Sequence, residues 1–507
     1  MAIIRDTDLH LVPGELVGEF HLGDSLWHVL EMMRTDKVRY GGTSVRWDRE
    51  DPTSPVIVDV PPGIRLVFPR TSSPHQQLLQ LIAIQLDGTQ AASSPVYPHS
   101  SNNASPAPKS AYPGALRLMY DDKHLTTINS PSTRRQPEKE QLTRSKITQV
   151  FGTTFSRRSP VPGSSSSAAA GKGGPSSNRS SPLLARETEI RYPGVVFQLY
   201  STVHGVEAGN AIVVVPPGRE ESVNPGRVWE VLDGTVKERA GAGKWDAFAA
   251  VSEKEVGLHG TIASCEIRPR HGILLRLHDV QLNTAAPRCT TTYEVEIGKT
   301  TGQDLLCDLG PPGRRYWKED DRFASRYPTN GTGTSAGRPD AQGGEERETS
   351  KGCWWNYFHL GLDFLVEELG EGRVMKIMVH SNIPGTAQFH THARCPWIIR
   401  KPSSSSSPPI TSSSKDVGYL SLESTLDELS AAFDVPASRR EWSNGDTSTA
   451  TARGVRGGRA MSTVLLDRLD EEFMSGVQDI EPSRLLALDG MVLEEAAGIG
   501  ITSVLLH

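Results

Sequence analysis

The chain has 507 residues, and its 54 Lys and Arg against 60 Asp and Glu give a net charge of −6. This mild acidity argues against a nucleic-acid binder that works through bulk charge. No apolar run approaches the roughly 18 residues of a membrane-spanning helix, and the charged first ten residues predict no secretory signal. Five widely spaced cysteines without a C-x-x-C pair predict reduced thiols and a cytoplasmic protein.

Several stretches are too rich in Ser, Gly and Pro to form a packed core. Residues 161–180 read VPGSSSSAAAGKGGPSSNRS and offer almost nothing to bury against the entropy of ordering the chain. The composition therefore predicts long disordered insertions and a mostly disordered tail with short amphipathic helices. The insertions are expected at about 88–114, 156–187 and 318–350, and the tail at 401–507.

The N-terminal region has the pattern of a capped helix followed by strands. Residues Phe20–Ser25 lead into Leu26, Val29, Leu30 and Met33, which share one face of a helix. Asp24 or Ser25 is the predicted N-cap. After this helix, 56–60 and 64–68 are apolar runs on either side of Pro61-Pro62-Gly63, which predicts a hairpin.

Further strands are predicted along the chain. Residues 78–86 are apolar on both faces, which favours a central strand. The middle region offers 211–215, 261–267 and 273–277 as strands. A last hairpin is predicted from 357–366 and 374–380, with Gly370 and Gly372 in its turn.

The helix-plus-strands pattern occurs three times. A good second match starts at Val295–Thr301 and continues into a helix with Leu305, Leu306 and Leu309, while a weaker copy carries Ile147, Val150 and Phe151. The expected units span about 18–87, 140–202 and 293–399 within a core of 12–400. The predicted fold class is α+β, with repeated helix-plus-antiparallel-sheet units that form one mainly β core. Chance similarity of short amphipathic helices is the alternative.

Searches for catalytic motifs give no constellation. No phosphate-binding G-x-x-x-x-G-K-[ST] loop is present. Gly333–Gly337 matches G-x-S-x-G, but its flanks are polar and lack the buried strand and helix of a nucleophile elbow. A hydrolase built on Ser335 is therefore a rival hypothesis, and a loop is the favoured interpretation.

One cluster has the composition of a metal site. His390 and His392 would share a face if 390–392 were a strand, with Cys395 and His380 as further ligands. A polar edge strand is the favoured interpretation. We therefore predict no catalytic residues, no cofactor and no metal ion.

Short motifs suggest possible contacts with partners. Tyr419–Leu422 and Trp229–Leu232 have the aromatic-x-x-aliphatic form of peptides that dock by strand addition, although the second is expected in the core. Arg314–Trp317 is a basic and aromatic cluster that could touch an anionic headgroup. In the tail, 424–433 and 464–473 are predicted amphipathic helices.

One stretch resembles a known family. Asn356–Leu365, with the sequence NYFHLGLDFL, and Val374–Gly385 resemble a signature of the phagosome assembly factor 1 family. Further similar segments are 20–23, 63–68 and 304–311, together with Phe389, His392, Arg394 and Cys395. The family pattern has one histidine near the Arg-Cys pair, so His390 is not carried over.

This resemblance implies a non-enzymatic protein of autophagy. It would act as an adaptor or scaffold at the phagophore assembly site, in complex with a WD-repeat β-propeller protein, and some members are linked to the Golgi. Phosphoinositide-membrane contact would be indirect or weak, and no nucleic acid is expected as a partner. A lipid or small-molecule binding protein of membrane trafficking, with a cavity between its sheets, is the alternative.

Overall fold

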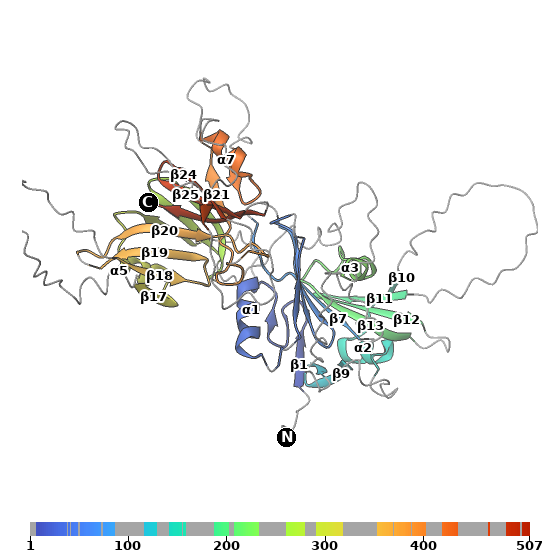
Figure 1. The fold of residues 1–507 in the computed structure, drawn as a ribbon. Helices are drawn as coiled ribbons and strands as arrows, with labels where there is room; N and C mark the ends of the chain where they lie inside the picture. The colour runs from blue at the N-terminus through green and yellow to red at the C-terminus, as the bar shows by residue number, and fades with distance from the viewer. Residues whose placement is uncertain are drawn as a thin grey trace, which may run out of the picture. The chain divides into compact units, whose positions relative to one another are not determined.

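The computed structural model divides the chain into two compact units (Figure 1). Unit 1 comprises Met1–Asp48, Ser54–Ser72 and Gln77–Leu258, and unit 2 comprises Arg49–Thr53, Ser73–Gln76 and His259–His507. None of the described helices is long and apolar enough to cross a bilayer. The structure describes residues 7–37, 39–40, 42–48, 51–71, 75–86, 116–128, 141–154, 156–158, 187–201, 207–232, 260–278, 291–317, 352–368, 370–386, 388–401, 418–433, 465–466, 483–496 and 499–507.

Unit 1 contains a five-stranded sheet in the order β3-β2-β1-β8-β9 and an eight-stranded sheet in the order β10-β11-β12-β13-β7-β6-β5-β4. Its helices are α1 (Leu26–Thr35), α2 (Arg144–Phe151) and α3 (Pro225–Leu232). Its strands are β1 (Thr7–Val12), β2 (Leu16–Val17), β3 (Phe20–His21), β4 (Ser44–Arg46), β5 (Val56–Val60), β6 (Ile64–Phe68), β7 (Leu81–Gln85), β8 (Leu116–Tyr120), β9 (Lys123–Ile128), β10 (Ser156–Arg158), β11 (Glu187–Tyr192), β12 (Val195–Ser201) and β13 (Glu207–Val214).

The local predictions for unit 1 hold where the sequence pattern is strong. The hairpin β5–β6 forms with the predicted bounds, and β7 lies between β6 and β13 in the middle of its sheet. Helix α1 begins after Ser25, whose hydroxyl accepts a hydrogen bond from the His28 amide, and it buries Leu26, Val29 and Met33.

Unit 1 buries both faces of its eight-stranded sheet. On one face, Phe197 of β12 contacts Phe151 of α2. The opposite face forms a separate apolar cluster with α3, in which Val228 and Trp229 pack over the strands. Figure 1 shows α3 beside these strands. A sheet that is apolar on both faces therefore has a cover on each.

Unit 2 contains a five-stranded sheet in the order β16-β15-β14-β21-β22 and an eight-stranded sheet in the order β17-β18-β19-β20-β26-β25-β24-β23. Its helices are α5 (Gly302–Asp308) and α7 (Leu426–Ala432). Its strands are β14 (Ile262–Arg268), β15 (Gly272–Leu277), β16 (Thr291–Glu296), β17 (Arg314–Trp317), β18 (Gly352–Tyr357), β19 (Leu362–Glu367), β20 (Val374–His380), β21 (Trp397–Arg400), β22 (Tyr419–Ser421), β23 (Leu465–Leu466), β24 (Ser483–Leu488), β25 (Met491–Ala496) and β26 (Gly500–Leu506).

The two units have the same strand topology. Strands β1–β13 correspond in order to β14–β26, and each five-stranded sheet has one parallel pair, β1–β8 in unit 1 and β14–β21 in unit 2. The register shift at Gln198/Leu199 in β12 recurs at Glu494/Glu495 in β25. Each unit contains two successive runs of a helix and four antiparallel strands, so this pattern occurs four times among the described residues.

The structure confirms the mainly β, α+β fold class and corrects its division into units. The fourth run begins at α7 and continues through β23–β26, inside the segment 401–507 expected to be a mostly disordered tail. Strand β26 pairs with β20 in the middle of the unit 2 sheet. The described part of that segment therefore belongs to unit 2, because apolar side chains of β24–β26 are buried in the same core as those of β18–β20.

Two local predictions differ from the structure, and a third is confirmed. The expected strand 357–366 is interrupted by a turn, where Gly361 has a positive φ, and β19 begins at Leu362. Within the expected helix 464–473, Leu465–Leu466 forms β23 instead. The predicted helix 424–433 is confirmed as α7, which has a capping box between Thr425 and Glu428.

The predicted insertions 88–114 and 318–350 lie outside the described residues. Of the third insertion, 156–187, the structure describes both ends: residues 156–158 form β10, which pairs with β11 from residue 188 onward. The side chains of Leu66, Phe68 and Phe197 are fully buried in unit 1, as is Phe364 in unit 2. These four side chains belong to the buried apolar cores of the two units.

Candidate functional site

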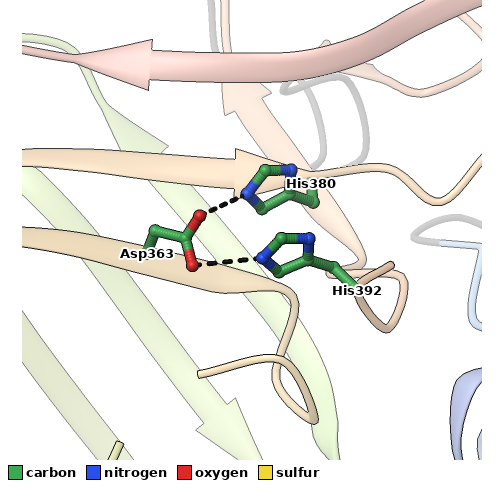
Figure 2. A group of neighbouring side chains, drawn as sticks. All are labelled: Asp363, His380 and His392. Atoms are coloured by element: carbon green, nitrogen blue, oxygen red, sulfur yellow. Dashed lines mark hydrogen bonds and ion pairs between the residues drawn. The ribbon is translucent and has the colours of Figure 1, made fainter. Parts of the chain in front are cut away.

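A cluster of three polar side chains is buried in unit 2. Asp363 is the second residue of β19, His380 is the last residue of β20, and His392 lies in the connection before β21. Figure 2 shows the carboxylate of Asp363 facing both imidazoles. Buried groups of this kind are expensive unless they are hydrogen-bonded, so their partners decide what the cluster can do.

The connection that carries His392 comes close to the turn between β18 and β19. The amide of Ala393 donates a hydrogen bond to the Phe358 carbonyl, 2.7 Å away. A Cβ at Gly361 would stand 2.2 Å from the carbonyl oxygen of Ala393. Only glycine permits this approach, and Gly361 also has a φ of 69°. The turn that interrupts the predicted strand therefore places His392 over Asp363.

The carboxylate of Asp363 bridges the two histidines. One oxygen lies 2.9 Å from Nε2 of His380 and the other 3.2 Å from Nε2 of His392. An ionised carboxylate only accepts hydrogen bonds, so each Nε2 carries a proton and donates. The two imidazole rings are stacked with centroids 3.8 Å apart and planes 11° apart. Asp363 therefore fixes the tautomer and the orientation of both rings.

Burial and hydrogen bonding act against each other on the acid. Burial raises the pKa of Asp363. The hydrogen bonds and charges of His380 and His392 lower it and together outweigh burial, so the net pKa lies well below the ordinary value. For His392, burial is the largest effect and lowers the pKa, and the hydrogen bond to Asp363 only partly offsets it. The carboxylate stays ionised while His392 resists taking up a second proton.

Arg394 ties down the connection next to the cluster. Its buried guanidinium donates to the carbonyl oxygens of Ser381 at 2.8 Å, Asn382 at 3.3 Å and Pro52 at 3.1 Å. Burial lowers the pKa of Arg394 to about 9. A cation held by three backbone carbonyls fixes the path of the chain on both sides of His392.

The three residues have ligand atoms within 4.8 Å of one another, which invites comparison with a metal site. A zinc ion sits about 2.0–2.1 Å from each imidazole nitrogen, along a lone pair in the ring plane. Nearly parallel stacked rings direct those lone pairs along separate lines, so one ion cannot meet both. The carboxylate already satisfies both Nε2 atoms. The arrangement fits a hydrogen-bonded cluster that locks the connection, and not a metal centre.

The structure assembles only part of the predicted metal candidate. It brings His380 and His392 together, while the amide of His390 donates to Asn382 and the free, buried thiol of Cys395 lies beside the free thiol of Cys265. Residues 390–392 lie in a turn, so the expected strand is wrong there. Sequence reasoning did not propose Asp363 for this site. A signal for Asp363 exists in the alternation of side chains along strands: Asp363 pairs with Met378, two residues before His380, so it lies on the same sheet face as His380.

The other motifs fall in different surroundings. Ser335 lies outside the described residues. Tyr419–Ser421 forms β22, which is paired with β21, and Leu420 and Leu422 are in the core of unit 2. Trp229–Leu232 lies in α3. Arg314–Trp317 forms the edge strand β17, where the Arg315 guanidinium stacks 4.2 Å from the centre of the Trp355 ring.

Comparison with known proteins gives the family. The model of the family described as phagosome assembly factor 1 matches residues 115–504, which extend over parts of both units. The chain belongs to the phagosome assembly factor 1 family. A family protein of Caenorhabditis elegans, described as a PHAF1 protein, is 28% identical over 113 residues. That match covers 22% of this chain and 22% of the relative. The comparison with solved structures finds no match.

Proposed function

We propose that this protein is a non-enzymatic adaptor or scaffold of autophagy. It is recruited to the phagophore assembly site and works there in complex with a WD-repeat β-propeller protein. The observation that carries the proposal is the family match over residues 115–504, because membership suggests a role in phagosome assembly or autophagy. Family membership supports the proposed process, autophagy, and the chemistry of the described side chains supports the proposed binding role.

The buried cluster supports a binding role over a catalytic one. Asp363, His380 and His392 are the residue types of a general acid or base, but the carboxylate and both Nε2 atoms are engaged with one another. A catalytic base must reach the proton that it abstracts, within hydrogen-bond distance in a plausible substrate pose. All three side chains are buried, so this cluster holds the fold together.

Recruitment tests the proposed process. The full chain, tagged and expressed at its natural level, is followed by microscopy in fed and starved cells and then purified with its bound proteins. We expect starvation-dependent puncta at early autophagic membranes and a copurifying WD-repeat protein. A diffuse signal under both conditions, with no such partner, would contradict the proposal.

A matched pair of variants tests the absence of catalysis. Asp363→Asn removes the charge of the carboxylate, and Ser335→Ala removes the hydroxyl of the rival hydrolase hypothesis. Each variant is first checked for its free energy of unfolding, so that only folded protein is compared. We expect both to support autophagic flux whenever they are folded and bind the partner. A folded variant that binds the partner but blocks flux would show that the protein has a catalytic step.

A further inference from the structure

The two units differ at one face of the eight-stranded sheet. In unit 1, five residues on neighbouring strands form the face that α3 covers, and each is at most 1% exposed. These residues are Ile57, Val67, Ala83, Val213 and Val196. The helix presents Val228, Trp229, Val231 and Leu232 to them. The covered face is therefore as dry as a protein core.

Strand registers identify the equivalent face in unit 2. Trp354 pairs with Leu365 as Ile57 pairs with Val67, and Met378 pairs with Leu505 as Ala83 pairs with Val213. Val492 continues the row next to Leu505, as Val196 does next to Val213. Tyr316, on the edge strand β17, pairs with Trp354 and extends the row. We call this set the open face: Tyr316, Trp354, Leu365, Met378, Leu505 and Val492.

The side chains of the open face are not covered as those of unit 1 are. Trp354, Leu365, Met378, Leu505 and Val492 are all partly exposed, and Tyr316 is 42% exposed. Leu305 of α5 and Leu426 and Leu429 of α7 pack into the core on the opposite side of the sheet. Within the described part of unit 2, no helix takes the place that α3 takes in unit 1.

We propose that the open face docks an amphipathic helix of a partner protein, in the place that α3 occupies in unit 1. The inference rests on the binding role proposed above and gives that role a surface. Unit 1 shows that this sheet topology accepts a helix of about two turns on this face, since α3 has eight residues. Helix-in-groove docking of this kind uses apolar anchors at i, i+3, i+4 and i+7.

Charge on the open face indicates the chemistry of the helix. Lys376 is exposed and pairs with Leu365 across the strands β19 and β20. Arg314 is exposed at the edge, and its guanidinium lies 5.8 Å from the centre of the Tyr316 ring. Glu367 is the partly exposed acid near the far end of β19. The two cations beside the apolar row favour a helix with acidic residues along one flank.

The buried cluster sets one end of the open face. Asp363 pairs with Met378 across β19 and β20, and the connection that carries His392 covers Asp363. Beyond Met378 along β20, the surface is closed by that connection. A docked helix therefore has to lie across the strands, from Tyr316 toward Val492.

Selection from a peptide display library provides the test. The purified full chain is the bait for a library of random 16-residue peptides, and the counter-selection uses the Leu505→Asp variant. We expect enriched peptides that become helical on binding, with one apolar stripe and acidic flanking residues. We expect Leu505→Asp to weaken the binding of these peptides by about tenfold or more, because the substitution places a charge at the centre of the interface.

Two further variants make the result specific. Leu306→Asp is the matched control, because Leu306 is a 38% exposed leucine of α5 outside the open face; it should leave binding unchanged. Lys376→Glu should switch the selection toward helices with basic flanks, a gain that misfolding cannot produce. Circular dichroism confirms that each bait is folded.

Other outcomes overturn the inference. Enrichment of extended peptides would point to strand addition at β17, and no enrichment would leave the open face without a helical ligand. Dimerisation of the chain that Leu505→Asp abolishes would make a second copy the occupant. If starvation recruits both wild-type and Leu505→Asp protein together with a WD-repeat partner, the proposed function stands and this surface does not carry it.

Discussion

Units 1 and 2 share a topology but place different residues at equivalent positions of one sheet face. At the position where unit 1 has Arg65 on β6, unit 2 has Asp363 on β19, as the strand registers show. Arg65 in unit 1 lies against the Trp229 ring of α3, with its guanidinium 5.1 Å from the ring centre. Asp363 in unit 2 holds two histidines of a connecting segment. The same sheet face is thus closed by a helix in unit 1, whereas in the described part of unit 2 a loop closes it at one end only.

The comparison teaches that topology alone does not determine which surface a unit exposes. Both sheets have apolar residues on both faces, and burying the second face requires a segment outside the repeated pattern. Unit 1 has that segment in α3. Unit 2 has an apolar row that is only partly covered, and exposed apolar rows of this kind mark interaction sites.

The largest expected effect comes from breaking the cover of unit 1. Val228→Asp places a charge among fully buried side chains and should lower the free energy of unfolding of unit 1 by about 4 kcal/mol. Leu505→Asp, on the equivalent face of unit 2, should cost about 1 kcal/mol because Leu505 is partly exposed. Urea unfolding monitored by hydrogen exchange in each unit measures both. Equal losses would show that the two faces are equally buried.

The next effect concerns the polar cluster of unit 2. Asp363→Ala leaves two buried imidazole N–H groups without an acceptor and should cost about 3 kcal/mol. Asp363→Asn keeps one acceptor oxygen and should cost about half as much. Thermal unfolding of the two variants gives the difference. If the alanine variant were as stable as wild type, the cluster would not be locking the connection.

Helix caps offer a smaller and more local comparison. The hydroxyl of Thr301 caps α5, and the Asp304 carboxylate in turn accepts a hydrogen bond from the Thr301 amide, while α1 has Ser25 alone. Thr301→Ala should destabilise unit 2 by about 1 kcal/mol, and Ser25→Ala should destabilise unit 1 by no more than that. Chemical denaturation of the two single variants compares them. A larger loss for Ser25→Ala would contradict the ranking.

The smallest expected effect is a dependence on pH. The folded pKa of His392 is lowered below its unfolded value of 6.5, so the unfolded state takes up a proton first as the pH falls. The stability of unit 2 is therefore retained above pH 6.5 and decreases below it, toward the lowered folded pKa. His392→Gln should remove this part of the slope. Melting temperatures of both proteins between pH 7.5 and 5.5 measure it, and parallel curves would contradict the assignment.

Much of the fold could be predicted because its signals are local. The hairpin around Pro61-Pro62-Gly63, the cap at Ser25 and the helix at 426–432 all depend on a few neighbouring residues. The strands β24 and β25 had such a signal as well, because Asp489-Gly490 separates two apolar runs and is a strong hairpin turn. The Ser- and Gly-rich composition of the preceding segments nevertheless predicts a tail there, which is wrong for these strands.

The site could not be predicted in the same way. His380, His392 and Asp363 come from three different elements, and Gly361 brings them together through a turn that interrupts an expected strand. His390 fits a metal-site pattern in the sequence, yet the turn directs its amide to Asn382. Spacing along the chain cannot show which of two neighbouring histidines faces a buried acid.

By itself, the sequence determined the mainly β class, the capped helices and the membership of a family, since each rests on short-range periodicity or on a matching stretch of residues. Only the tertiary structure decided that the pattern occurs four times in two units, and that the last strands pair with β20 in the middle of a sheet. The physical reason is that strand pairing and burial join residues far apart in the chain. Whether an apolar face is covered depends on which distant segment comes to lie on it.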